Sequence, residues 1–498
     1  MPRSAWWTCA VRVAQAALAA VVALGVCAMV GCTAAPVDTA GSGAASQEPA
    51  AGTVPQAGEP SAGAPEVERV KTPVGTAWRL TRPGSAADGM TWGQAMSPDG
   101  RHVAYLTLSR FDPDKYLRMR NRLTVCRADG TDPWVAIDAI RNNCAKMHLV
   151  PRVVWTADGT TLYCINNTDP WGMGPVRVWK VDVAARKVTD LGVFLKDLTY
   201  VLMRACLGPG GKSLAFASSD HRLHQVDPGH NFYPVVLVTP EGREVRTEAK
   251  YKDVLASPLG GTVIGVDAVR RELRRIAPDG SATTLHTYGK DQFVVRLHFG
   301  GETGNVLMVS ARWRDRKAWK PTMGSRNNPV FNVWLVNPQG EAAEVKTGAF
   351  QDSIVPLPQD DAVLVGEIGK PYVAHPFAKT RRDLDLTGPV WAAPSPSAEV
   401  PCAVLRSITK SADGHRTAPV LDHVTLLNWQ TGKSVRLEGR PFDALRWPVS
   451  WSADGRWLAF SRAPGKGSPV EVPKMIDPPH DFIGGEIWVL RLSEEIGQ

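Results

Sequence analysis

A short motif recurs along this chain of 498 residues and constrains its fold more than any other feature. The segment MSPDGRHVAYLT at 96–107 recurs as WTADGTTLYCIN at 155–166 and as WSADGRWLAFSR at 451–462. In each copy an Asp-Gly pair, which favours the positive φ of a tight hairpin turn, separates two apolar segments. Weaker copies begin at residues 207, 256, 299, 356 and 394. The repeat therefore predicts eight units, each built on β-hairpins.

The spacing of the motif predicts how each unit is built. Asp99 and Asp454 lie 355 residues apart over seven intervals, which gives about 51 residues per unit, and four-stranded propeller blades repeat every ~40–50 residues. A strand with Trp on one face marks the third strand of several units, as in 178–181, 333–336 and 487–490. We predict an all-β fold, a single β-propeller of eight four-stranded antiparallel blades, with seven blades as the alternative count.

The two ends of the repeat region predict how the ring closes. The last unit has a third strand, Glu486 to Leu492, but almost no chain left for a fourth. An extra strand, Thr76 to Leu80, precedes the first unit. We expect this N-terminal strand to complete the last blade, because a closed ring has no open sheet edges.

The SPDG motif with its following Ala-Tyr or Ala-Phe, together with the Trp-bearing third strand, resembles a known group of propellers. The group is the WD-like "PD" repeat propellers, which includes the periplasmic TolB family and the propeller halves of prolyl-oligopeptidase-type peptidases. The resemblance covers residues of about 70–492. It implies the fold, and it implies no particular activity, because one fold hosts many functions.

The N-terminus predicts export. Arg3 and Arg12 precede an apolar segment at 13–31, which ends in Met29-Val30-Gly31-Cys32. This arrangement resembles the bacterial lipoprotein signal, with Met where Leu is usual. The resemblance implies that residues 1–31 are a signal peptide and that Cys32 is lipidated. An uncleaved transmembrane anchor is the alternative, because the apolar segment approaches the length that spans a bilayer.

Residues 32–65 follow as the lipidated cysteine and a tether of Ala, Gly, Pro and Ser that is too poor in apolar residues to fold. Residues 66–498 form the propeller. We expect a cell-envelope protein that is lipid-anchored facing the periplasm or exterior, on the outer membrane if the cell has two membranes. Loss of Arg3 and Arg12 lowers the net charge from +8 to +6. No Lys/Arg run indicates nucleic-acid binding, and we expect a monomer.

Loop length predicts which face of the ring binds. The connections between second and third strands are long in several units, whereas the turns after first and third strands are short. Long loops on a rigid scaffold are where binding concentrates. The candidate binding residues in and beside these loops are Phe111, Tyr116, Trp171, Trp313, Arg316, Trp319 and Phe482. Packing of these rings within their own loops is the alternative.

A histidine-rich loop in the third unit offers a second hypothesis. His221, His224 and His230, beside Asp220 and Asp227, have the side chains that bind divalent metals. Oligogalacturonate lyases share a related propeller and use metal-bound His. The alternative function is therefore a membrane-tethered, metal-dependent lyase or hydrolase of acidic glycans. A solvated polar loop is the other interpretation of these residues.

Other catalytic motifs are missing from the sequence. No G-x-S-x-G nucleophile elbow occurs, and we expect no hydrolase domain after the propeller. We expect no cofactor, a divalent metal only under the alternative hypothesis, and a non-enzymatic scaffold that binds an envelope protein or glycan. Besides two cysteines in the signal peptide and the lipidated Cys32, five cysteines remain. Cys164 and Cys402 are expected in the core, and a bridge among Cys126, Cys144 and Cys206 stays open.

Overall fold

The computed structural model describes most of the predicted ring. The described ranges are 67–81, 91–111, 119–142, 152–167, 175–196, 201–219, 233–257, 261–300, 303–312, 330–347, 354–359, 361–366, 371–386, 390–409, 420–443, 445–462 and 486–497. The chain divides into two compact units, Met1–Val54 and Pro55–Gln498, and every described residue belongs to the second. The predicted signal peptide, Cys32 and the tether lie outside these ranges. Among the described residues, no helix is long and apolar enough to cross a membrane.

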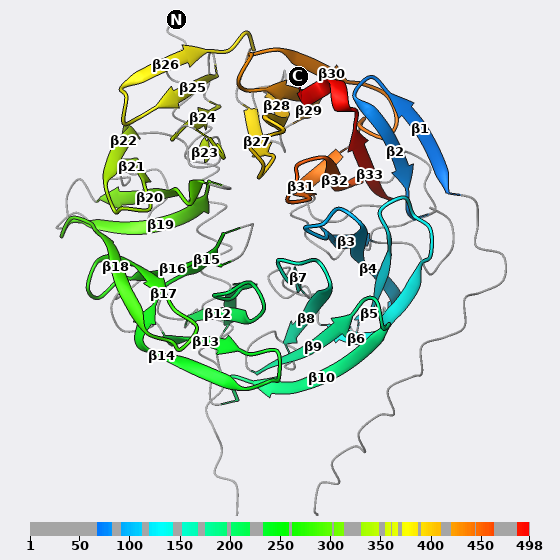
Figure 1. The fold of residues 1–498 in the computed structure, drawn as a ribbon, viewed down its shortest axis with the longest axis horizontal. Coiled ribbons are helices and arrows are strands. Elements are labelled where there is room, and N and C mark those ends of the chain that lie inside the picture. Colours follow the sequence, from blue (N-terminus) through cyan, green and yellow to red (C-terminus); the bar gives the residue numbers. More distant parts are fainter. Residues whose placement is uncertain are drawn as a thin grey trace, which may run out of the picture. The chain divides into compact units, whose positions relative to one another are not determined.

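Eight antiparallel sheets are arranged in a ring as an eight-bladed β-propeller (Figure 1). The prediction of eight four-stranded blades is confirmed. Blades 1 and 2 contain β3 (Thr91–Met96), β4 (His102–Phe111), β5 (Met119–Arg127), β6 (Trp134–Asn142), and β7 (Arg152–Trp155), β8 (Thr161–Asn167), β9 (Val176–Asp182), β10 (Lys187–Phe194). Blades 3 and 4 contain β11 (Val201–Leu207), β12 (Leu214–Ser219), β13 (Tyr233–Val238), β14 (Glu244–Tyr251), and β15 (Val254–Ala256), β16 (Val263–Asp267), β17 (Glu272–Ile276), β18 (Ala282–Thr287).

The next three blades follow the same order. Blades 5 and 6 contain β19 (Gln292–Phe299), β20 (Val306–Arg312), β21 (Val330–Val336), β22 (Ala342–Thr347), and β23 (Ile354–Pro356), β24 (Val363–Val365), β25 (Tyr372–His375), β26 (Thr380–Asp383). Blade 7 contains β27 (Val390–Pro394), β28 (Cys402–Thr409), β29 (Val420–Asn428) and β30 (Ser434–Leu437). The first strands of neighbouring blades contact one another around the centre of the ring, and Figure 1 shows fourth strands such as β10, β14 and β26 at its periphery.

Blade 8 joins the two ends of the ring. It contains β31 (Leu445–Trp451), β32 (Trp457–Arg462) and β33 (Glu486–Leu492), and a 3₁₀ helix, η4 (Glu494–Gly497), follows β33. The N-terminal strand β2 (Gly75–Arg79) pairs antiparallel with β33, so that Ala77 lies opposite Leu490. The predicted closure by the N-terminal strand is therefore confirmed.

A fifth strand, β1 (Glu68–Thr72), lies outside β2 in blade 8 (Figure 1). No sequence pattern predicts this strand, because its residues, ERVKT, lack the apolar alternation of the other strands. Its pairing with β2 depends on backbone hydrogen bonds, and charged side chains suit a strand at an open sheet edge.

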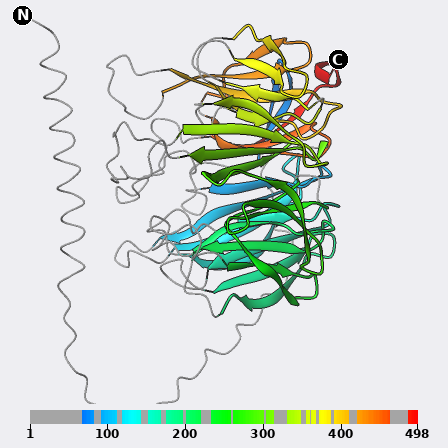
Figure 2. The same cartoon turned by 90° about the vertical axis from the view of Figure 1, so that its left-hand side faces the viewer.

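The strands of each blade follow one another in sequence order and run across the thickness of the ring (Figure 2). The ring therefore has two different rims. Turns after first and third strands emerge at one rim, which we call the turn rim. Connections after second and fourth strands emerge at the other, which we call the loop-bearing rim. β1 runs antiparallel to β2, so the chain enters blade 8 at the loop-bearing rim.

Side-chain hydrogen bonds explain the recurring motif at the turn rim. In blade 1 the Ser97 hydroxyl donates to the Asp99 carboxylate and accepts the His102 amide at 2.9 Å. Asp99 Oδ1 also accepts the Arg101 amide at 3.0 Å, and Gly100 has a φ of 70°. The same bonds recur in the turns at 156–161 and 452–457. The motif thus encodes a hairpin turn through local contacts.

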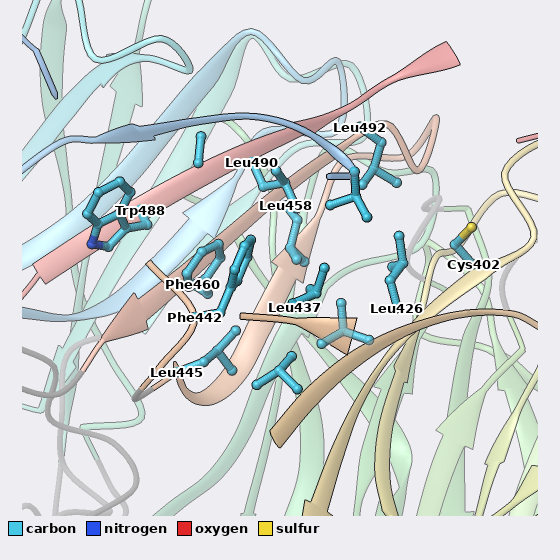
Figure 3. Close-up of a cluster of buried hydrophobic side chains, with 14 of the residues drawn as sticks. Cys402, Leu426, Leu437, Phe442, Leu445, Leu458, Phe460, Trp488, Leu490 and Leu492 are labelled. Atoms are coloured by element: carbon cyan, nitrogen blue, oxygen red, sulfur yellow. The ribbon is translucent and has the colours of Figure 1, made fainter. Parts of the chain in front are cut away.

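The hydrophobic core consists of eight clusters, one at each interface between neighbouring blades. In the cluster between blades 7 and 8, the Phe442 and Phe460 rings stack at 5.8 Å near the buried Trp488 (Figure 3). Indole groups add hydrogen bonds across two interfaces: Trp155 Nε1 donates to Ala95 O at 3.0 Å, and Trp451 Nε1 donates to Ala393 O at 3.2 Å. Every blade is therefore buried on both faces.

The closing strand allows a direct test at Gly75, whose φ is 152°. A Cβ there would lie 1.9 Å from the backbone oxygen of Arg491, inside the β2–β33 pairing. We expect Gly75→Ala to lower the free energy of unfolding by about 3 kcal/mol. Gly432→Ala is the control, because Gly432 has a φ of 78° but no atom within 4 Å of a Cβ. It should cost ~1 kcal/mol. Equal losses in urea denaturation would show that the close approach is unimportant.

Candidate functional site

The predicted binding residues belong to connections of the loop-bearing rim. Between second and third strands these connections comprise residues 112–118, 168–175, 220–232, 313–329, 410–419 and 463–485. Phe111 is the last residue of β4, and only its backbone is described. Outside the described residues lie Tyr116, Trp171, Trp313, Arg316, Trp319, Phe482, His221, His224 and His230. The binding face and the metal site therefore stay predictions.

The second strands end at the loop-bearing rim with buried polar residues. In blades 1, 2, 4, 5 and 8 the tenth residue after the start of the turn motif is polar. In blades 1, 2, 5 and 8 it lies two positions beyond a core residue that packs on the preceding blade; these core residues are Tyr105, Cys164, Met308 and Phe460. Four of the five polar side chains are at most 6% exposed, and the fifth is 15% exposed; they are Thr107, Asn166, Asp267, Ser310 and Arg462. Each of these blade interfaces therefore changes from apolar to polar as it approaches this rim.

Blade 4 shows one such polar end in full, because its second-to-third turn is short and described. Asp267 accepts hydrogen bonds from the amides of Val269 at 3.1 Å and Arg270 at 2.9 Å. The Arg274 guanidinium lies 3.8 Å from the same carboxylate. Tyr288 donates to the Asp267 carbonyl at 3.4 Å. Asp267 thus holds a tight turn and has a structural role.

A buried lysine lies at the neighbouring connection between blades 3 and 4. Lys252 Nζ donates to the Val294 carbonyl and lies 5.8 Å from the centroid of the Phe293 ring. Burial lowers the pKa of Lys252, and nearby Asp253 acts in the opposite direction. The ammonium group joins the connection to β19 of blade 5.

A second polar end, in blade 8, is the most highly charged group that the structure describes. We call it the closure cluster: Glu486, Arg79, Arg440, Arg462 and Trp488. Glu486 is 3% exposed. Its carboxylate accepts from Arg440 Nη2 at 2.7 Å and Trp488 Nε1 at 2.9 Å. Arg462 Nη1 and Arg79 Nη1 lie 3.4 and 3.5 Å away.

The residues of the closure cluster come from distant parts of the chain. Arg79 ends β2, Arg462 ends β32, Glu486 begins β33, and Arg440 lies in the connection from β30 to β31. Glu68 of β1 adds a second carboxylate, 3.0 Å from Arg79 and 3.6 Å from Arg440. The cluster therefore ties both ends of the ring together at the loop-bearing rim.

The surroundings of Glu486 keep it ionised. Burial alone would raise the pKa of its carboxyl group. Hydrogen bonds from Trp488 and Arg440, and the positive charges of Arg440 and Arg462, outweigh burial and lower the pKa. No sequence pattern indicates these residues, because Arg462, Arg440 and Arg79 lie 24, 46 and 407 residues from Glu486, with no common spacing.

The described residues contain no group of three or more His, Cys, Asp and Glu placed to hold a metal ion. The described cysteines, Cys126, Cys164, Cys206 and Cys402, form no disulfide with one another, so Cys126 and Cys206 are not bridged to each other. Cys144 lies outside the described residues. Burial raises the pKa of Cys164 to about 12 and of Cys402 to about 11. These two thiols therefore stay protonated at neutral pH and belong to the core, as expected.

Comparisons with known proteins found distant structural likenesses. No protein-family model and no curated protein matches this sequence. An oligogalacturonate lyase from Vibrio parahaemolyticus is 10% identical, with 86% of this chain and 98% of that one covered and a TM-score of 0.45. Sqt1 from Saccharomyces cerevisiae is 10% identical, covering 84% and 99%, with a TM-score of 0.45. TolB from Acinetobacter baumannii is 13% identical, covering 64% and 78%, with a TM-score of 0.30. None of these likenesses carries an argument about ligand or reaction.

The closure cluster predicts a pH-dependent contribution to stability. Glu486→Gln should lower the free energy of unfolding at pH 7 by about 3 kcal/mol, because it leaves the largely buried Arg462 guanidinium without its counter-charge and removes one of the two carboxylates beside Arg79 and Arg440. The folded-state pKa of Glu486 lies below its ordinary value of 4.5. The stabilisation is therefore complete above that value and is lost as pH falls through the folded pKa.

Urea denaturation of both proteins at pH 7 and at pH 3 tests this prediction. The difference between wild type and Glu486→Gln should shrink at the lower pH. Glu438→Gln is the control, because Glu438 is 71% exposed and pairs with Arg436 at the surface, where loss of an ion pair costs below ~1 kcal/mol. A difference that stays constant with pH would contradict the assignment.

Proposed function

We propose that this protein is a membrane-anchored lipoprotein of the bacterial cell envelope whose β-propeller is a binding scaffold for a protein or glycan. The ring supplies rigidity, because both faces of every blade are buried against a neighbour. The ligand would bind at the loop-bearing rim. The lipid on Cys32 and the tether would hold the ring near the membrane.

One observation carries this proposal: the two rims differ in how much chain they hold. At the turn rim the chain reverses through compact hairpin turns such as 97–101 and 452–456. At the loop-bearing rim six of the eight second-to-third connections are long, up to residues 463–485 in blade 8. Long connections on a rigid scaffold are where binding residues concentrate. The asymmetry supports binding at a single rim.

The course of β1 supports a second feature of the proposal. Because β1 starts at the loop-bearing rim, the tether reaches the ring on the same side as the long connections. A flexible linker of this length and composition spans about 30 Å on average. A ring held at that distance would meet partners that themselves reside at the membrane surface.

The binding face can be tested with a double substitution, Trp319→Ala with Arg316→Ala. An aromatic and an Arg are the residues most often found at binding hot spots, so we expect partner retention to fall at least about tenfold. The measurement is a cross-linking pull-down from native envelope. The melting temperature should stay unchanged, which separates lost contacts from lost folding.

Arg101→Ala is the control for this pull-down, because Arg101 is 80% exposed at the turn rim. It should retain the partner fully. Equal retention by the double variant and wild type would show that these connections do not form the binding face.

The anchor is tested by labelling cells with radioactive palmitate. The wild-type protein should incorporate label and fractionate with membranes, whereas Cys32→Ala should remain unlabelled. Cys27→Ala is the control, because bulky Val26 precedes this cysteine and it should not be the lipidation site. Membrane association of an unlabelled wild-type protein would indicate an uncleaved apolar anchor.

A further inference from the structure

We propose that the closure cluster binds an oxyanion, the carboxylate or phosphate group of a ligand, at the loop-bearing rim between blades 7 and 8. The cluster carries more positive than negative charge. Arg79, Arg440 and Arg462 contribute three guanidinium groups. Glu486 and Glu68 contribute two carboxylates, and Glu68 is 34% exposed. A buried charge without a counter-charge is costly, so this arrangement favours an added anion.

Two of the guanidinium groups have a buried donor that is unused. The Nε atoms of Arg79 and Arg462 are both buried without a hydrogen-bond partner. The side chains of these two residues are each 15% exposed. Leaving a buried donor unsatisfied costs about 1–3 kcal/mol, and more for a charged group. An acceptor at these positions would remove that cost.

The geometry of Arg462 identifies the kind of acceptor. Arg462 contacts Glu486 through Nη1 alone. Nε lies on the other edge of the planar group, where an Arg offers a fork of two parallel N–H donors. A carboxylate or phosphate accepts both donors of such a fork at once, with more specificity than a neutral acceptor. The unused edge of Arg462 therefore fits an oxyanion.

Packing and hydrogen bonds hold the cluster in place, and Arg440 is its solvent-exposed arginine. Arg440 is 42% exposed, and its guanidinium lies over the Trp488 ring at 5.7 Å from the centroid. Trp488 is fully buried (Figure 3), and it donates its indole N–H to Glu486. Side chains that are already fixed in place lose little conformational entropy when a ligand binds. The anion would approach past Arg440.

Glu486 does not occupy the unused donors, but its negative charge repels a second anion in the cluster, and this gives the proposal opposite predictions for two variants. Glu486→Gln removes this negative charge, so it should tighten oxyanion binding about tenfold. Arg462→Gln removes the fork, so it should weaken binding about tenfold. Both variants lower stability, so a merely structural role would not move binding in opposite directions.

The experiment is isothermal titration of the purified full chain with sodium phosphate and, separately, with sodium acetate, at constant ionic strength set by sodium chloride. We expect saturable binding of at least one anion at millimolar concentration, and the stronger arm identifies a phosphate or a carboxylate ligand. Arg462→Lys is included because it keeps the charge beside Glu486 but lacks the fork, so it should fold and bind weakly. Arg436→Gln, 59% exposed on β30, is the unaffected control.

Two results would overturn the proposal: no saturable binding of either anion by wild type and Glu486→Gln, or affinities of Glu486→Gln and Arg462→Gln that change in the same direction. The idea that the anion is part of a binding partner at the loop-bearing rim rests on the proposed function. The existence of the anion site does not rest on it. If the protein binds the anion but retains no envelope partner in the pull-down, the anion site is supported and the scaffold function is contradicted.

Discussion

The pairing of β2 with β33 is the interaction on which the rest of the structure depends. Each blade buries both of its faces against neighbours, so the core exists only as long as the ring is complete. A gap at any interface would expose two apolar surfaces at once. The chain closes its ring with a strand from its own N-terminus, opposite the last strand of the repeat. The hydrogen bonds of that pair connect residues that are farthest apart in the sequence.

The two rims of the ring follow different physical rules. The turn rim is held by local contacts, in which a Ser or Thr and an Asp within one motif satisfy the backbone of the same turn. The loop-bearing rim is held by contacts between distant segments, such as the closure cluster. Because these contacts lie within one turn, they leave little freedom for the length of the turn to vary. Nonlocal contacts at the other rim leave the connections free to differ in length from blade to blade.

This difference explains what could be predicted from the sequence. Asp99-Gly100 and its copies identify the blades because a hairpin turn needs its residues side by side. The sequence of residues 76–80 reads as a strand, and the last unit lacks a fourth strand, so together they indicate that residues 76–80 close the ring. Arg79, Arg440, Arg462 and Glu486 could not be found in this way, because no pattern links them until the ring brings them together. The predicted binding residues, including Trp319, stay predictions for a related reason: their positions depend on connections whose conformation the repeat does not determine.

The fifth strand of blade 8 has a mechanical consequence. A force on the tether is applied to the ring at the start of β1, at the loop-bearing rim. If the force pulls along the ring axis, it acts parallel to β1 and loads all the hydrogen bonds between β1 and β2 together, in shear. Had the chain joined the ring directly at Gly75, the same force would act at the turn rim and peel β2 from β33 one bond at a time. β1 therefore protects the strand that closes the ring from tension.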